Sequence, residues 1–73
     1  MEKFNVNKVR GKRKELGLTQ NDMAELIGIS NITFFLKEKG EREFTITELE
    51  KIAEITHEPI NYFFEKKVNK MRT

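Results

Sequence analysis

An all-α fold, a compact bundle of five short helices, is predicted by three features of the 73-residue sequence. Apolar residues recur at spacings of three and four, which is the period of one helix face. Residues that cap helix starts and glycines that suit helix ends divide the chain into segments of helical length. No segment shows the alternation of apolar and polar residues that is typical of a strand. One domain with a small core is expected at this length.

The first helix is expected to begin after Asn5 or Asn7, because either side chain can cap it. It is predicted to end near Leu16, with Gly17 as its C-terminal stop. An arginine falls on its apolar face, and a buried arginine needs a charged partner. The inward residues are expected to be Val6, Val9, Arg13 and Leu16.

The middle of the chain predicts two short helices joined by a tight turn. Thr19 can cap the first of them, and Asp22 stands three residues later in a capping-box arrangement. Gly28 suits the left-handed end of this helix, Ser30 can cap the next, and Gly40 ends it. Two short helices joined by a turn containing glycine form the helix-turn-helix pattern, whose second helix enters the DNA major groove. The inward residues of the first are expected to be Met23, Ala24, Leu26 and Ile27.

Two more helices are predicted in the last third of the chain. Thr45 and Glu48 form a capping box for the fourth helix, which is expected to run to about Ile55. His57 follows where a glycine would suit the turn, and Pro59 fits the first turn of a final short helix. The inward residues are expected to be Ile46, Leu49, Ile52, Ala53, Ile55, Ile60, Phe63 and Phe64.

Composition argues against several classes of protein. There is no cysteine and only one histidine, so disulfides, thiolate metal sites and a histidine-based metal site are not expected. No nucleophile–base set or phosphate-binding glycine loop is present, so we expect neither an enzyme nor a small-molecule substrate. No apolar run approaches the roughly 20 residues that span a bilayer, and no signal-peptide pattern opens the chain. A cytoplasmic protein without a membrane partner is expected.

The charge is distributed unevenly along the chain. Residues 1–18 carry six basic and two acidic residues, a local charge of +4. Residues 41–58 carry six acidic and two basic residues, a local charge of −4. Most of these side chains are expected to face solvent, but a basic segment beside a helix-turn-helix pattern favours phosphate binding.

Three stretches of the chain stand in the order and spacing of one family: RGKRKELGLTQNDMAELIGIS, KEKGEREFT and ELEKIAEITHEPINYFF. On these stretches, within residues 6–64, the sequence resembles the Cro/C1-type (XRE-like) helix-turn-helix family of phage and bacterial repressors. It is most similar to the small regulators of phages and mobile elements. The resemblance implies a lambda-repressor-like DNA-binding domain with the helix-turn-helix at helices 2 and 3. It also implies binding to double-stranded operator DNA as a two-fold dimer, without enzyme chemistry or a cofactor.

The resemblance also implies which residues contact DNA. For Asn31, a hydrogen bond to adenine is favoured over simple capping or solvent exposure. Ile32 could touch a thymine methyl, and simple exposure or partial burial is an equally good explanation of that residue. Arg13 and Glu38 match a buried ion pair with a structural role. Base readout is expected from Gln20, Asn31, Ile32, Phe35 and Leu36, and phosphate contact from Thr19, Ser30, Thr33, Arg10, Lys37, Lys39 and Arg42.

Two features depart from the family pattern. Phe35 and Leu36 stand where the family usually carries polar groups that read bases, and Glu41 and Glu43 stand where lysines often contact phosphate. Phe35 could pack inward, contact thymine methyls, or form part of an apolar surface for a protein partner. The leading prediction is a Cro-like or compact repressor. The alternative is a small phage-type anti-repressor or modulator that binds a second repressor protein through Phe35 and Leu36.

The ends of the chain are expected to lie outside the folded domain. Residues 1–5 are predicted to be a flexible N-terminus, residues 6–64 the domain, and residues 65–73 a basic, disordered tail. There is no room for a separate dimerisation domain, so a homodimer would be weak and would depend on concentration. The resemblance places its interface at Glu58, Pro59, Tyr62 and Phe64.

Overall fold

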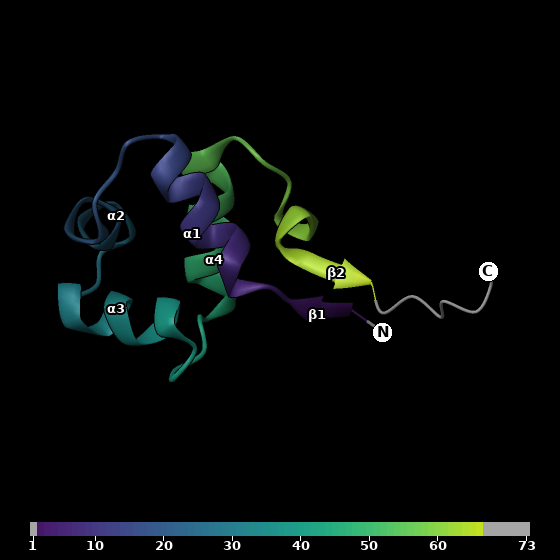
Figure 1. Cartoon of the computed structure of the whole chain (residues 1–73), viewed down its shortest axis with the longest axis horizontal. Coiled ribbons are helices and arrows are strands. Elements are labelled where there is room, and N and C mark those ends of the chain that lie inside the picture. Colours follow the sequence, from purple (N-terminus) through teal and green to yellow (C-terminus); the bar gives the residue numbers. More distant parts are fainter. Residues whose placement is uncertain (1, 67–73) are drawn as a thin grey trace.

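The computed structural model describes residues 2–66 and has the predicted all-α architecture, to which it adds a short two-stranded ribbon (Figure 1). In this part of the chain four α-helices and one 3-10 helix follow one another through short turns. The elements in chain order are β1 (Glu2–Phe4), α1 (Val6–Glu15), α2 (Gln20–Ile27), α3 (Asn31–Lys39), α4 (Ile46–Thr56), η1 (Ile60–Phe63) and β2 (Phe64–Lys66).

The predicted starts of the four α-helices are confirmed. Asn5 caps α1, since its side-chain oxygen accepts a hydrogen bond from the amide of Asn7. Thr19 and Asp22 form a reciprocal capping box at α2, and the same exchange joins Thr45 and Glu48 at α4. Ser30 caps α3 by accepting from the amide of Thr33 at 3.0 Å. These caps satisfy amides that have no partner within their helix.

The predicted helix ends are confirmed as well. Gly28 and Gly40 terminate α2 and α3, each in the left-handed conformation with a φ of 93°. His57 terminates α4 at a φ of 60°, where a side chain is strained and glycine would not be.

The core lies where the four α-helices meet η1. Three residues expected to point inward are instead exposed: Leu16 by 44%, Leu26 by 53% and Ile46 by 64%. Leu16 lies in the C-cap of α1, past the last helical turn, and Ile46 is the first residue of α4. Leu26 falls about 60° outside the arc that the buried residues of α2 occupy at 3.6 residues per turn. The buried apolar residues are Val9, Met23, Ala24, Ile27, Phe34, Leu49, Ile52, Ala53 and Phe63.

The prediction that the chain has no strands is wrong. Glu2–Phe4 pairs antiparallel with Phe64–Lys66, and Phe4 lies opposite Phe64. Phe4 also makes edge-on ring contacts with Phe64 and Phe44, at centroid distances of 5.5 and 5.8 Å. Three-residue strands are too short to show an alternating pattern, so sequence reasoning missed them. Residues 67–73, the rest of the predicted tail, lie outside the described part of the chain.

The expected fifth helix is a 3-10 helix, and Pro59 is its N-cap residue rather than part of its first turn.

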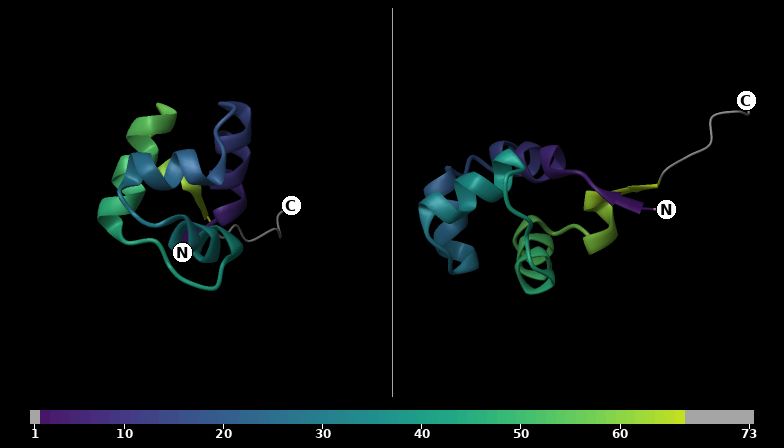
Figure 2. Two further views of the ribbon diagram at one scale, coloured as in Figure 1. Left: turned by 90° about the vertical axis from the view of Figure 1, so that its left-hand side faces the viewer. Right: turned by 90° about the horizontal axis from the view of Figure 1, so that it is seen from below.

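The views that show the long axis of the molecule place α2 and α3 at one end and the β1–β2 ribbon at the other (Figures 1 and 2). Among residues 2–66 no helix combines the length and apolar character needed to cross a membrane.

Candidate nucleic-acid interface

The outward face of α3 is the candidate interface. At about 100° per residue, its exposed positions occupy one continuous arc, and the buried side chains Phe34, Lys37 and Glu38 occupy another. Ile32 is 70% exposed and Phe35 43% exposed. The inward rotation of Phe35 that the sequence left open is therefore not observed. The outward face comprises Asn31, Ile32, Phe35, Leu36 and Lys39, of which Leu36 is half-buried.

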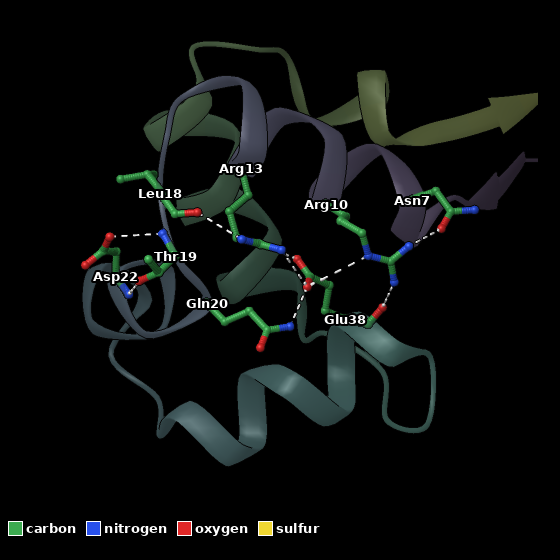
Figure 3. Close-up of polar contacts among 8 residues, drawn as sticks. All are labelled: Asn7, Arg10, Arg13, Leu18, Thr19, Gln20, Asp22 and Glu38. Carbon is green, nitrogen blue, oxygen red and sulfur yellow. Dashed lines mark hydrogen bonds and ion pairs between the residues drawn. The ribbon is translucent and has the colours of Figure 1, made fainter.

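A buried polar network fixes α3 from the opposite side (Figure 3). Arg13 of α1 donates to Glu38 through Nε at 2.8 Å and through a terminal guanidinium nitrogen at 3.2 Å. The Glu38 side chain is 1% exposed, so its charge depends on these donors. Arg13 also donates to the backbone oxygen of Leu18, at 2.9 Å, before α2 begins. The expected Arg13–Glu38 pair is thus formed, and it joins three parts of the fold.

Gln20, a residue predicted to read bases, belongs to this network. Its side-chain nitrogen donates to Oε1 of Glu38 at 2.8 Å, and the side chain is half-buried (Figure 3). One N–H of the Gln20 amide is therefore engaged within the protein. The second N–H and the amide oxygen are left for other contacts.

Arg10, a predicted phosphate contact, also turns toward the C-terminal end of α3. Its guanidinium donates to the side-chain oxygen of Asn7 at 2.7 Å and to the backbone oxygen of Glu38 at 3.0 Å (Figure 3). The backbone contact satisfies one of the last carbonyls of α3, which have no partner within the helix. In this conformation Arg10 holds α3 against α1 instead of reaching outward.

Lys37, another predicted phosphate contact, is on the wrong face of α3. It is 8% exposed, and its ammonium donates to Oε1 of Glu48 on α4 at 2.5 Å. Partial burial by itself raises the pKa of the Glu48 carboxyl, but hydrogen bonds from Lys37 and the Thr45 amide hold it below its usual value. Lys37 lies about 100° of helix rotation from the nearest outward position, Leu36. The spacing of residues in the sequence therefore already places Lys37 away from the outward face.

The three hydroxyl residues predicted to contact phosphate lie at the starts of α2 and α3. Thr19 accepts from the amide of Asp22, while its own amide donates to the Asp22 carboxylate at 2.9 Å. That amide hydrogen bond is the main reason the pKa of the Asp22 carboxyl is lowered. The Ser30 hydroxyl donates to that of Thr33 at 2.7 Å. The Ser30 hydroxyl proton is therefore used inside the protein.

Lys39 and Arg42 are the two cations of the predicted phosphate set that remain exposed. The Lys39 ammonium lies 3.3 Å from a carboxylate oxygen of Glu41 and 5.5 Å from the centre of the Phe35 ring. Because both groups of the Lys39–Glu41 pair are more than half exposed, the pair contributes little to stability and can open.

The four residues predicted to form a dimer interface lie around η1. A Glu58 carboxylate oxygen accepts from the Lys12 ammonium at 2.9 Å, and this bond is the main cause of a raised Lys12 pKa. The Tyr62 ring lies below the ammonium of Lys8, at 4.9 Å. Phe64 packs against Phe4 within the chain, so it supports the ribbon, whereas Pro59 is exposed.

Among residues 2–66 no group of three or more potential metal ligands gathers.

Comparison with known proteins gives matches only at the level of structure. No protein-family model matches the sequence, and no curated protein matches it. The DNA-binding domain of the P22 C2 repressor is 22% identical, with a TM-score of 0.73 over 80% of this chain and 76% of that one. An HTH_3-family transcriptional regulator from Vibrio cholerae is 33% identical, with a TM-score of 0.68 over 80% of this chain. The present chain spans 33% of that regulator.

Two further structures share the fold. SinR, solved in complex with SinI, is 19% identical, with a TM-score of 0.75 over 89% of this chain and 67% of that one. HppE, solved as its cobalt(II) form with substrate, is 24% identical, with a TM-score of 0.76 over 89% of this chain. Only 36% of HppE is covered, so the likeness concerns one part of that protein. These likenesses confirm the predicted resemblance, and the chain has the fold of the Cro/C1-type (XRE-like) helix-turn-helix family.

Proposed function

We propose that this protein is a transcriptional regulator that binds operator DNA by inserting α3 into the major groove. The observation that carries the proposal is the outward face of α3, which is exposed while the opposite side is held by the Arg13–Glu38 network. A reading helix must present its side chains in fixed register with the bases, and a helix tied to α1, α2 and α4 meets this need. The likeness to helix-turn-helix repressors supports the same function.

Contacts to phosphate would be few. Lys37 is buried and Arg10 is engaged, which leaves Lys39 and Arg42 as the cations of the predicted set that can reach the DNA backbone. Two such contacts in each protomer give four in a dimer. The logarithm of the binding constant should then fall with the logarithm of salt concentration at a slope of about −3.6.

The proposed active form is a weak homodimer. Two copies related by a two-fold axis would place their reading helices in successive major grooves, roughly 34 Å apart, on a pseudo-palindromic operator. The surface around η1, with Pro59 and Tyr62, is the proposed contact between the copies. Repression would follow because the bound dimer blocks access of the polymerase, and the protein would act in the cytoplasm.

Selection from a random duplex-DNA pool at moderate salt, followed by fluorescence anisotropy of the enriched duplexes, tests this function. We expect a two-fold-symmetric sequence that binds far more tightly than its scrambled counterpart. Ultracentrifugation with and without that duplex reports whether two chains bind. Weak binding that shows no sequence preference and fades with salt would refute the proposal.

A second candidate function rests on the exposed apolar side chains of α3. Ile32 and Phe35 are large apolar residues on one open face, and such a face also suits a protein partner. A small anti-repressor or modulator would use Phe35 and Leu36 to bind a second repressor. Under this alternative, Phe35→Ser abolishes capture of that repressor from a panel of purified repressors, whereas capture that persists would count against it.

A further inference from the structure

We infer that α3 reads A·T base pairs, chiefly by apolar contact of Ile32 and Phe35 with thymine 5-methyl groups. This inference rests on the proposed function, because it names the chemistry that the DNA site must offer. Two observations carry the inference. The outward face of α3 presents mainly apolar side chains. The basic side chains Lys37, Arg10 and Arg13, which could otherwise read guanine, are bound to acceptors within the protein.

The outward face of α3 offers little hydrogen-bonding chemistry. In angular order it carries Asn31, Phe35, Lys39, Ile32 and Leu36, so three of five side chains are apolar. Ile32 and Phe35 are three residues apart and therefore lie side by side on the helix surface. In the major groove the thymine methyl is the apolar feature that distinguishes a base pair. Asn31, at the N-terminal end, can bond adenine through two atoms, which again selects A·T pairs.

Guanine is read most often by an arginine or lysine whose donors are directed at two acceptors of the base. Lys37 is bound to Glu48, and Arg10 and Arg13 are bound to Glu38. The amide nitrogen of Gln20 is also bound to Glu38.

The two exposed cations lie at the C-terminal end of this surface. Lys39 is the last residue of α3, with its ammonium between Glu41 and the Phe35 ring, and Arg42 lies beyond Gly40. Both positions suit contact with the phosphate backbone. Along the helix axis, Ile32 and Phe35 lie between Asn31 at the N-terminal end and Lys39 at the C-terminal end, so they occupy the middle of the outward face.

The size of the effect follows from the area that one methyl group buries. Removing one buried methyl-sized group changes a binding constant by about fourfold. A two-fold-symmetric site contains each contact twice, so losing the same methyl from both half-sites should weaken binding by about sixteenfold. Polar contacts of Asn31 and contacts to phosphate would be unaffected by this loss.

The test replaces thymine with uracil, which lacks only the 5-methyl group, in the duplex enriched from the random pool. Uracil is placed at one symmetric pair of positions at a time, and anisotropy measures binding by the full chain. We expect a loss of about sixteenfold at the positions facing Ile32 and Phe35 and less than twofold at thymines outside the site. In the Ile32→Ala variant, uracil at the positions facing Ile32 should cause no further loss.

A matched control variant is Ile46→Ala, which makes the same change at a residue that is 64% exposed, close to the 70% of Ile32. It lies at the start of α4, and the uracil effect in this variant should equal that in the parent chain. Thermal unfolding checks that each variant is folded. An enriched site that is rich in G·C, or one whose binding does not respond to uracil, overturns the inference while leaving DNA binding intact. Failure to enrich any site refutes the proposed function itself, and the inference with it.

Discussion

The buried network behind α3 should be the most sensitive point of the fold, and Arg13→Met tests it. The substitution keeps most of the side-chain volume but removes both guanidinium donors to Glu38, a residue that is 1% exposed. Glu38 would keep the donor from Gln20 at 2.8 Å and the more distant Arg10 nitrogen at 4.0 Å. Stranding one partner of a buried ion pair costs about 3–5 kcal/mol.

We expect a loss of about 3 kcal/mol, the low end of that range, because Gln20 and Arg10 partly replace the missing donors. For a domain of this size, that corresponds to a fall in Tm of roughly 12–24 °C. Urea unfolding followed by circular dichroism measures the free energy, and calorimetry measures Tm.

The double variant Arg13→Met, Glu38→Leu is the control for this prediction. Replacing both charges with apolar side chains removes the stranded carboxylate, so the double variant should be clearly more stable than Arg13→Met alone. A loss below about 1 kcal/mol for Arg13→Met would show that the pair is not the main support of α3. A double variant no more stable than the single one would show that packing, rather than the stranded charge, explains the loss.

Three other substitutions test separate features. His57→Gly should raise the unfolding free energy by about 0.5–1 kcal/mol in urea unfolding, because glycine adopts the left-handed end of α4 without strain. Phe4→Ala should cost about 1–3 kcal/mol by the same assay, since two edge-on ring contacts are lost. The Glu48 pKa is lowered in the folded state, so its stabilisation is complete above the unfolded pKa and is lost as pH falls through the folded one. Glu48→Gln should therefore flatten the pH dependence of Tm in acid, and an unchanged acid profile would contradict that assignment.

Local rules were sufficient to predict the helices from the sequence. Capping pairs such as Thr19–Asp22 and Thr45–Glu48 act over three residues, and Gly28 and Gly40 act on their own turn. Such signals do not depend on the rest of the fold, so the starts and ends of the α-helices can be predicted directly from the sequence. The family resemblance then supplied the expectation that Arg13 and Glu38, 25 residues apart, would meet.

The β1–β2 ribbon could not be predicted in this way. Phe4 and Phe64 are 60 residues apart, and each strand is only three residues long. The pairing depends on where η1 places β2 relative to β1, and therefore on the tertiary structure. Phe4 also makes ring contacts with Phe64 and Phe44, which no local pattern indicates.

The sequence predicts the candidate site only in part, because the basic or polar character of a residue does not determine which face of a helix it occupies. Asn31, Ile32 and Phe35 do lie on the outward face of α3. Lys37 is basic and belongs to the phosphate set that the resemblance implies, but its position on the helix directs it toward Glu48. The engagement of Arg10 and Gln20 by Glu38 depends on how α1, α2 and α3 pack, and that was not available from the sequence.

Whether α3 is the reading helix can be tested by mapping the amide chemical shifts of the isotope-labelled chain as the enriched duplex is added. We expect the largest changes on α3, Asn31–Lys39, and on the start of α2 near Gln20. The β1–β2 ribbon, at the other end of the molecule, should change little (Figure 1). Changes that cluster on the ribbon or on α4 and leave α3 unaffected would contradict the claim that α3 is the reading helix.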